Sequence, residues 1–509
     1  MSILKADNDT GPARWRAVSP WDRERMELGL RTLLVGGGAA ARTVARDLRR
    51  SPDYGLRLIG CLDDDPHLRS ISGVQLLGTL TDLNRIVRER SVEAVVIAIP
   101  SLSPGRLSEL VRQATNTGVH VRYLPSFLSA LERVARAADM RIVDFNRLLG
   151  RREHRGSPWV ARAAFYGERV LVTGAGGSIG QELCRQVRSC GPASLHMLDH
   201  DESNLHTLQL ALDGEALLDS PDVIIADIRD SDRISQVFDA IRPTIVLHAA
   251  AHKHLPLLER HPCEGVKSNV QGTQNLVEAA LEVGVTRFLL ISTDKAADPR
   301  SILGATKRLA EMVLQAHATR STRMCSVRFG NVLGSRGSFL TAIADQLEKG
   351  GVVTVTHPEV TRYFMTVEEA VGLVLSATSM AEFGETFVLD MGQPVRIVDL
   401  VNRYAEQLHV PEVQIRYTGL RPGEKLHESL FGDDENQLPT VDGAIWATRP
   451  VRLPEDFPES LEKLYLAAAK GEDEVVRTHL QDLMPEYSPA PTSAKELLSA
   501  LSTPYPDEF

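Results

Sequence analysis

The chain has 509 residues, of which 43% are hydrophobic and 24% are charged. This length exceeds one ordinary hydrophobic core, so two or more domains are expected, and the composition is that of a soluble globular protein. The formal net charge of -10 argues against a nucleic-acid partner, because phosphate binding needs a basic face and no long Lys/Arg-rich run stands out.

The lengths of the hydrophobic runs and the spacing of the cysteines argue against a membrane protein, a disulfide framework and a zinc site. The longest apolar runs, such as "AVVIAIP" and "RFLLIS", have the length of strands and fall far short of the roughly 18 to 20 residues that cross a bilayer. Residues 1–28 form a polar leader without the apolar core of a signal peptide. The five cysteines have no C-x-x-C spacing, so neither disulfides nor a zinc site is predicted. We therefore expect a cytoplasmic protein without a membrane span.

Residues 29–150 are predicted to form a first nucleotide-fold domain. "TLLVGGGAAARTVARDLRR" combines a strand, a glycine turn and an amphipathic helix, and "LRLIGCLDDDP", "VEAVVIAIPS" and "GVHVRYLPS" supply further strands. Gly36, Gly38 and Ala41 fit G-x-G-x-x-A, and Asp63 or Asp64 follows near the position of a ribose partner. Two interpretations stay open: the domain binds a ligand, or it has lost its ligand and mainly mediates assembly.

The next segment, residues 151–165, is predicted to be an exposed linker because "GRREHRGSPW" is polar and basic. A second and stronger nucleotide-fold pattern, "RVLVTGAGGSIGQELCRQVRS", opens a domain over residues 166–485. Its Gly174, Gly177 and Gly180 would allow a tight turn, a close approach to a pyrophosphate, and close packing of helix on strand.

The cofactor site is expected to continue along the chain from that glycine loop. Ser178 and Ile179 begin the helix, whose N–H groups would face the phosphates. Asp199, in "LHMLDHDE", would accept hydrogen bonds from the adenosine ribose, and its charge would repel a 2′-phosphate, which favours NAD over NADP. The remaining candidates are contributed by "VIIADIRD" and "TIVLHAAAHKH": Asp227, Ile228, Ala249 and Ala250.

Three closely spaced histidines raise the possibility of a metal site. His248, His252 and His254 follow one another in "TIVLHAAAHKH", but no clustered carboxylate completes a ligand set. We therefore predict no metal, and expect Lys253 and His254 to lie near an anionic substrate.

Seven ordered segments resemble one family: "VLVTGAGGSIGQEL", "HAAAHKHLPLLE", "ISTDKAADP…GATKR", "RFGNVLGSRGS", "HPEVTRYFMTVEEAV", "DMGQPVRIVDL" and "GLRPGEKLHESL". They look like the UDP-N-acetylglucosamine 4,6-dehydratases of capsule, flagellin-glycan and general glycosylation pathways, which are extended short-chain dehydrogenase relatives. The resemblance implies an α/β protein of two Rossmann-like, doubly wound parallel-sheet domains in series. It also implies a small C-terminal substrate-binding subdomain, bound NAD and a UDP-sugar substrate. We expect a homo-oligomer.

Two features depart from that family. Long members usually carry membrane helices ahead of the first nucleotide fold, and no such block precedes it here, so membrane attachment is not carried over. Leu303 stands four residues before Lys307, where short members have tyrosine and long members commonly have methionine.

The reaction that the resemblance implies removes hydride from C4 of the sugar, eliminates water across C5 and C6, and returns hydride to C6 with C5 configuration retained. Carried over by motif, Asp294 is the acid, Lys295 the base, Lys307 the holder of the nicotinamide ribose, and Thr293 a hydroxyl facing the C4 oxygen. Partial burial is expected to raise the pKa of Asp294 and lower that of Lys295. The alternative for this triplet is a helix cap followed by a solvated charge pair.

Because Leu303 cannot act as a base, the C4 proton is expected to leave through Thr293, a water, or the ribose hydroxyl and Lys307. Substrate contacts are expected from later segments: Asn331, Arg336, Arg362, Arg421 and Glu424. Arg421 adjoins a proline-fixed turn that suits bidentate contact with a diphosphate, whereas Lys425 is expected to form a surface pair.

Competing functions stay open from sequence alone. One is a nucleotide-sugar epimerase or a dehydratase that inverts C5, and another is a non-catalytic NAD and UDP-sugar sensor or scaffold, suggested by Leu303. The C-terminal "SLEKLYLAAAKGEDEVVRTHLQDLMPEY" predicts two amphipathic helices, and residues 486–509 predict a mostly flexible tail.

Overall fold

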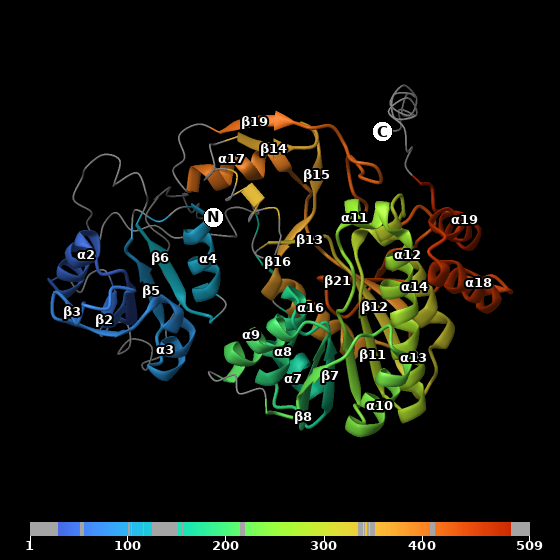
Figure 1. The fold of residues 1–509 in the computed structure, drawn as a ribbon, viewed down its shortest axis with the longest axis horizontal. Coiled ribbons are helices and arrows are strands. Elements are labelled where there is room, and N and C mark those ends of the chain that lie inside the picture. Colours follow the sequence, from blue (N-terminus) through green and yellow to red (C-terminus); the bar gives the residue numbers. More distant parts are fainter. Residues whose placement is uncertain are drawn as a thin grey trace, which may run out of the picture. The chain divides into compact units, whose positions relative to one another are not determined.

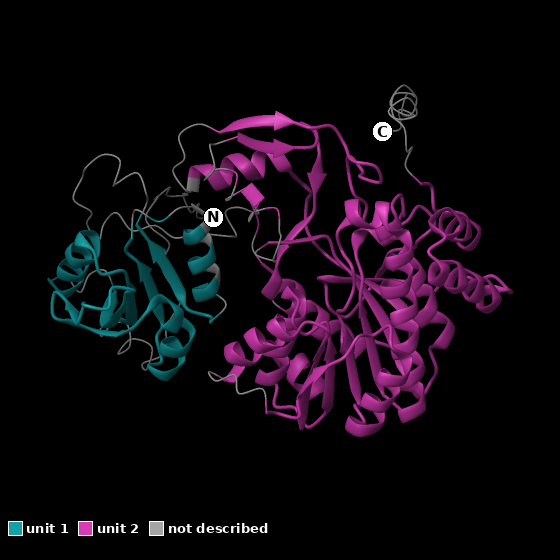
Figure 2. Cartoon of the chain, in the orientation of Figure 1, with its two compact units in different colours: residues 1–143 teal, residues 144–509 magenta. Residues whose placement is uncertain are grey.

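The computed structural model divides the chain into two compact units, residues 1–143 and 144–509 (Figure 2). It describes residues 29–50, 55–99, 102, 104–115, 117–124, 151, 153–154, 156–213, 219–333, 339, 342–343, 346, 352–407 and 413–489. The polar leader, most of the predicted tail and Arg336 lie outside the described residues. The predicted fold class, two Rossmann-like α/β domains in series, is confirmed.

The first unit is a six-stranded sheet in the order β3-β4-β2-β1-β5-β6, parallel except for the β3–β4 pair (Figure 1). Its central strand is apolar because helices can cover both faces of a parallel sheet, and Leu33 and Leu34 are fully buried. The elements are β1 (Leu30–Val35), α2 (Ala39–Arg50), β2 (Leu56–Leu62), β3 (Ser70–Ile71), β4 (Val74–Gly78), η2 (Leu80–Asp82), α3 (Leu83–Glu89), β5 (Ala94–Ile97), α4 (Pro104–Thr115) and β6 (His120–Tyr123).

The second unit is built on a nine-stranded sheet in the order β20-β21-β17-β12-β11-β10-β7-β8-β9. The seven strands from β17 to β9 run parallel, and β20 and β21 add an antiparallel edge. The strands are β7 (Arg169–Thr173), β8 (Ser194–Asp199), β9 (Val223–Ile225), β10 (Ile245–His248), β11 (Arg287–Ile291), β12 (Arg323–Arg328), β17 (Phe383–Leu389), β20 (Leu438–Pro439) and β21 (Ile445–Thr448).

Helices cover both faces of this sheet. The core of one face contains side chains of α7 (Pro158–Phe165), α8 (Ser178–Ser189), α9 (Glu202–Asp213) and α16 (Val367–Met380). The core of the other face contains side chains of α10 (Ser231–Ile241), α13 (Gly272–Val283) and α14 (Ile302–His317). Because the strand order reverses between β7 and β10, the carboxyl ends of these strands form the crevice where open α/β sheets bind ligands.

Short elements after β12 form a smaller layer beside the sheet (Figure 1). Three two-stranded sheets pair β13 with β16, β14 with β19, and β15 with β18. Their bounds, with the adjoining helix, are β13 (Asn331–Leu333), β14 (Val352–Val355), β15 (Thr361–Arg362), β16 (Phe364–Thr366), β18 (Val395–Arg396), α17 (Ile397–Gln407) and β19 (Gln414–Tyr417).

The two helices predicted near the C-terminus are α18 (Phe457–Lys470) and α19 (Asp473–Leu483). Their apolar faces share a core with α14 and with short elements that follow β10. These are α11 (Leu255–Arg260), α12 (Pro262–Gly265) and the π-helix η4 (Val266–Gln271).

The structure corrects the prediction of an exposed linker over residues 151–165. Helix α7 buries Ala161 and Phe165 in the core of the second unit, because its apolar residues share one face. Arg151 is also paired with the buried Glu369 at 2.6 Å. This segment therefore belongs to the second unit.

Candidate functional site

The glycine loop lies between β7 and α8 and leaves no room for side chains at two positions. Gly174 has φ +65°, and a Cβ there would lie 2.5 Å from the backbone nitrogen of Ala250. A Cβ on Gly180 would lie 2.0 Å from the carbonyl oxygen of Gly174. Ser178, Ile179 and Gly180 form the first turn of α8. The loop is therefore pressed against the end of β10, and the helix N-terminus begins directly at it.

A cavity of about 220 Å³ opens beside this loop. It brings together seven of the predicted cofactor residues: Gly174, Gly177, Asp199, Asp227, Ile228, Ala249 and Ala250. Ser178, Ile179, Gly180 and Lys307 do not line it. Sequence reasoning missed other lining residues, which come from loops and helices without a recognisable pattern: His200, Asn204, Arg229, His252 and Ser268.

Two carboxylates shape the cavity wall. Asp199 ends β8 and is nearly buried, and its Oδ2 accepts a hydrogen bond of 2.9 Å from the backbone N–H of Gly176. Asp227 forms an ion pair of 2.6 Å with Arg229. The hydrogen bonds from Arg229 lower the pKa of Asp227, so this carboxyl is ionised at neutral pH.

Thr293, Asp294 and Lys295 lie just after β11, where Thr293 is the N-cap of the 3₁₀ turn η5 (Asp294–Ala296). Asp294 is fully buried, and its Oδ1 accepts hydrogen bonds from the Thr293 hydroxyl at 2.9 Å and from Lys295 Nζ at 3.0 Å. Its Oδ2 is buried without a hydrogen-bond partner among the described residues. The helix cap of the alternative interpretation is present, but the charge pair beside it is buried rather than solvated.

A second carboxylate, Glu428, contacts the same lysine. Its Oε1 lies 3.4 Å from Lys295 Nζ and 3.9 Å from Arg362 Nε. Burial favours the neutral amine of Lys295, but the charges of Asp294 and Glu428 outweigh burial and raise its pKa above the ordinary value. The expectation of a lowered pKa was therefore wrong, because it did not include the charges of Asp294 and Glu428.

Lys307 lies on α14, and its side chain reaches the last residue of β11. Its Nζ donates a hydrogen bond of 2.6 Å to the carbonyl oxygen of Ile291. Burial lowers the pKa of Lys307 to about 8, although the charge of Glu311 opposes the shift. Leu303, one turn earlier, is buried in the apolar core that also contains Leu258.

The histidines do not form a metal site in the part of the chain that is described, where no cluster of three or more potential ligands occurs. His248 is buried between the hydroxyls of Thr173 at 2.7 Å and Thr273 at 3.0 Å. Burial lowers the pKa of His248 to about 3, so it is a neutral core residue. Lys253 and His254 lie on an exposed stretch before α11 and line neither cavity described in this section.

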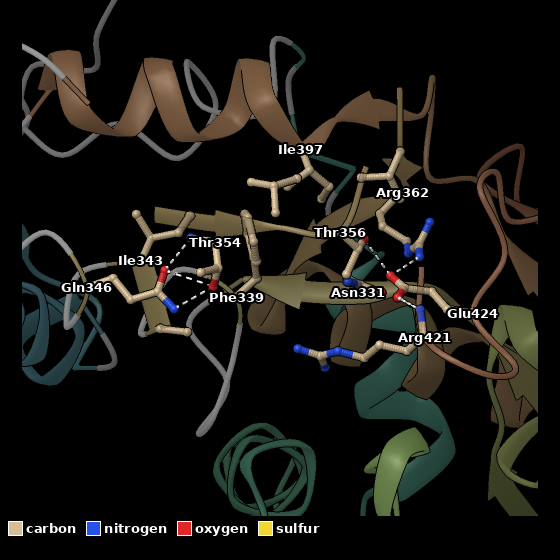
Figure 3. Close-up of a pocket in the computed structure, with 13 residues that line it drawn as sticks. Asn331, Phe339, Ile343, Gln346, Thr354, Thr356, Arg362, Ile397, Arg421 and Glu424 are labelled. Carbon is tan, nitrogen blue, oxygen red and sulfur yellow. Dashed lines mark hydrogen bonds and ion pairs between the residues drawn. The ribbon is translucent and has the colours of Figure 1, made fainter. Parts of the chain in front are cut away.

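A second cavity, of about 260 Å³, brings together four predicted substrate residues: Asn331, Arg362, Arg421 and Glu424. In Figure 3, Arg362, Thr356 and the backbone nitrogen of Arg421 converge on the Glu424 carboxylate, at 2.9, 3.0 and 3.2 Å. The Arg421 guanidinium points away from Glu424. Apolar side chains also line the cavity, and sequence reasoning missed them because they come from separate short elements: Phe339, Ile343, Val355, Val360 and Ile397.

The expected surface pair of Lys425 is also corrected. Lys425 Nζ lies 3.0 Å from Asp298 Oδ2, and its side chain is only 9% exposed. The pair joins the loop that follows β19 to the segment between η5 and α14, so it fixes that loop beside the candidate catalytic residues.

The strand order, the glycine loop and the polar cluster after β11 define the extended short-chain dehydrogenase/reductase class. Residues 170–449 match the polysaccharide biosynthesis protein family, and residues 13–125 match a CoA-binding domain. The chain belongs to the polysaccharide biosynthesis protein family. Capsular polysaccharide biosynthesis protein CapD of Staphylococcus aureus is 40% identical over 414 residues, which cover 79% of this chain and 69% of that protein.

Dehydratases and epimerases are both among the relatives of the chain. A UDP-N-acetylglucosamine 4,6-dehydratase (inverting) of Campylobacter jejuni is 30% identical over 280 residues, covering 54% of this chain and 80% of the relative. A UDP-glucose 4-epimerase of Rickettsia rickettsii is 30% identical over 279 residues, covering 53% and 80%. The structure of Pen from Bacillus thuringiensis superposes with a TM-score of 0.51 at 32% identity, covering 57% of this chain and 90% of Pen.

No helix among the described residues has both the length and the apolar character needed to span a membrane. The predicted homo-oligomer and cytoplasmic location stay predictions.

Proposed function

We propose that the protein is an NAD-dependent 4,6-dehydratase of UDP-N-acetylglucosamine that retains the configuration at C5. The observation that carries the proposal is the Asp294 carboxyl, which is fully buried, bonded to Lys295 and left with one unpartnered oxygen. Such a carboxyl, at the carboxyl end of a parallel sheet, suits a general acid. The dehydratase relative supports the reaction class.

The residues around the first cavity fit NAD. A Cβ would collide with backbone at both Gly174 and Gly180, so the loop is bare backbone, and Gly177, the N-cap of α8, lines the cavity, as a pyrophosphate site requires. Asp199, held by Gly176, would accept the ribose hydroxyls, while Asp227, Ile228, Ala249 and Ala250 would surround the adenine and the rest of the cofactor. NAD would supply the hydride acceptor for C4 and the hydride donor for C6.

The second cavity would hold the nucleotide half of the substrate. Arg421 and Arg362 supply the positive charge for a diphosphate, and Arg421 is exposed with its guanidinium turned away from Glu424. The apolar residues of the lining, which include Val355 and Ile397, suit the face of a uracil ring. Asn331 would orient the sugar toward Asp294.

Two proton transfers would come from one hydrogen-bonded pair. The Asp294 carboxylate and Lys295 ammonium hold one transferable proton 3.0 Å apart. Moving it to Asp294 yields a carboxylic acid and a neutral amine without changing the net charge. The amine would then remove the C5 proton, and the acid would protonate the leaving C6 hydroxyl. The Lys295 ammonium would return a proton to C5 when hydride reaches C6, and the proton taken from the C4 hydroxyl would restore the original ion pair.

The C4 hydroxyl needs a proton acceptor, and the apolar side chain of Leu303 cannot be one. Thr293 donates a hydrogen bond of 2.9 Å to Asp294, so the oxygen of its hydroxyl would accept a hydrogen bond from the C4 hydroxyl and orient it. Lys307 has a pKa lowered to about 8 by burial, so a fraction of its amine is neutral near that pH and can receive a proton through the ribose hydroxyl.

The test is incubation of the purified protein with UDP-N-acetylglucosamine, followed by mass spectrometry. The expected product has lost the mass of one water. Asp294→Asn and Lys295→Met should each lower turnover at least about 100-fold, the scale of a lost general acid or base. Asp222→Asn, which changes a carboxylate paired with His196 on β8, is the matched control and should leave turnover unchanged.

An isobaric product would instead support the epimerase alternative, which the Rickettsia relative makes a candidate. Asp294 and Lys295 favour the dehydratase because simple epimerisation at C4 needs no acid at C6. Tight binding of NAD and UDP-sugar without any keto product, across several sugars, would support the sensor alternative.

A further inference from the structure

We propose that Glu428 is a positioning residue of the catalytic pair: it holds Lys295 beside Asp294 and balances the positive charge that Lys295 acquires when it removes the C5 proton. The inference rests on the proposed function and assigns a role to a residue that lies in the segment "GLRPGEKLHESL" but was not among the predicted site residues. Glu428 belongs to the loop that follows β19, far along the chain from η5.

The geometry joins three charged groups in a row. Lys295 Nζ lies 3.0 Å from Asp294 Oδ1 and 3.4 Å from Glu428 Oε1. The Glu428 side chain is only 2% exposed, and its Oε2 has no hydrogen-bond partner among the described residues. Lys295 therefore bridges two buried carboxyl groups, each of which has one unpartnered oxygen.

Burying these three charged groups costs free energy unless each is balanced by an opposite charge nearby. Buried carboxylates are destabilising when they lack partners. The other cation near Glu428, Arg362, is 3.9 Å away and makes its closer ion pair of 2.9 Å with Glu424. Lys295 is thus the principal counter-ion of Glu428, and loss of its positive charge would leave Glu428 buried and poorly balanced.

A second carboxylate changes what the pair can do during elimination. With Asp294 alone, a protonated Lys295 is balanced only after Asp294 has given its proton to the leaving hydroxyl. With Glu428 present, Lys295 can take the C5 proton while Asp294 is still an acid, because Glu428 supplies the opposite charge throughout. Deprotonation at C5 can then precede loss of water, and Lys295 and Asp294 need not act at the same instant.

Glu428→Gln removes the charge but keeps the shape. Because the negative charge favours the ammonium form, its removal should move the alkaline limb of the kcat profile downward by about one to three pH units. At pH values above the shifted limb, turnover of Glu428→Gln should be at least about tenfold lower than that of the unchanged protein. Reduced nicotinamide, followed by its absorbance in a single turnover, should accumulate, because C4 oxidation continues while elimination slows.

Two further variants separate charge from packing. Glu428→Asp retains the charge on a shorter side chain, so its pH profile should resemble that of the unchanged protein even if its rate is lower. Asp434→Asn removes an exposed carboxylate from the same loop and should change neither profile nor rate. A Glu428→Gln profile that coincides with that of Asp434→Asn would overturn the proposal. A profile of Glu428→Asp that shifts as far as that of Glu428→Gln would also overturn it.

A readout without substrate separates this inference from the proposed function. The rate at which acetic anhydride modifies Lys295, measured by peptide mass spectrometry across pH, follows the neutral amine. In Glu428→Gln this rate should rise at lower pH than in the unchanged protein, and equal midpoints would defeat the role of Glu428. If the unchanged protein forms no dehydrated product, the proposed function fails, whereas a shifted midpoint would still support the charge coupling of Glu428 to Lys295.

Discussion

The two units begin with the same local design and then diverge. Each has a strand, a glycine loop and a helix, and each places an aspartate against that loop: Asp63 directly follows β2, and Asp199 ends β8. A Cβ on Gly37 would lie 2.9 Å from Asp63 Oδ2, and a Cβ on Gly176 would lie 3.0 Å from Asp199 Oδ2. The central strand orders, β2-β1-β5-β6 and β8-β7-β10-β11, are equivalent.

The units differ in where they keep their charges. Among the described residues of the first unit no charged side chain is buried, and its aspartates bond to nearby backbone, as Asp64 does with the N–H of Leu80 at 2.9 Å. The second unit buries charged groups around the ends of β11 and β12, including Asp294, Lys307 and Arg328. The shared sheet and loop therefore occur with two different distributions of charge, and the candidate catalytic residues belong to the second unit.

The largest expected effect tests this difference in buried charge. Arg328 is fully buried and pairs with Glu311 at 2.7 Å and Glu435 at 2.6 Å. Arg328→Met leaves both carboxylates without their main partner and should lower the free energy of unfolding by about 3–5 kcal/mol. Arg85→Met in the first unit removes pairs with Asp82 and Glu89 that solvent already screens, so it should change little. Urea unfolding measures both, and equal effects would remove the distinction between the units.

A pair of glycine substitutions compares the two loops directly. Gly180→Ala would place a Cβ 2.0 Å from a backbone oxygen that cannot move independently, so it should destabilise the second unit by about 3 kcal/mol and reduce bound NAD. Nothing lies within 4 Å of a Cβ at Gly38, so Gly38→Ala should be neutral or slightly stabilising. Thermal unfolding distinguishes them, and a harmful Gly38→Ala would mean that the first loop is as closely packed as the second.

The fold was predictable where the signal was local. Strands such as β1 and β7 are apolar runs followed directly by glycines. The apolar run and the glycine turn lie within one short segment, so both can be recognised in the sequence. The hairpin of β3 and β4 was missed because a strand of two residues has no periodicity. Helix α7 was taken for a linker because it follows a polar, basic segment and because its apolar face is evident only from its packing against the sheet.

The candidate site was predictable only where its signal in the sequence was local. The glycine loop and Asp199 follow from spacing, and Asp294 and Lys295 from the resemblance to a family. The contact between Lys295 and Glu428 joins distant segments through tertiary folding, so no spacing in the sequence contains it. Without that contact the direction of the pKa shift of Lys295 could not be predicted, because burial and the two carboxylates act in opposite directions.

A third prediction concerns pH and the second unit. Burial lowers the pKa of Lys307 from 10.5 to about 8 in the folded chain. Between these values the unfolded chain binds a proton that the folded chain has released, so the contribution of Lys307 to stability increases as pH rises from 8 to 10.5. The full change is about 3 kcal/mol, at 1.36 kcal/mol per pH unit.

Unfolding free energies of the unchanged protein and Lys307→Met, measured across this pH range, isolate the effect as their difference. Lys463→Met, which removes an exposed lysine of α18, is the control and should give a difference that does not vary with pH. A flat difference for Lys307→Met as well would show that its amine is not perturbed by burial.

The smallest expected effect asks which unit binds the dinucleotide. Asp199→Asn keeps an oxygen that can accept from Gly176 but loses the charge that would bind the ribose, so NAD affinity should fall about 10- to 100-fold, the value of one charged hydrogen bond. NADP should gain relative to NAD, because the charge no longer repels its phosphate. Asp63→Asn should change neither affinity. Fluorescence titration with both cofactors measures this, and the reverse result, with Asp63→Asn the weaker binder, would assign the dinucleotide to the first unit and leave the polar cluster of the second without its hydride carrier.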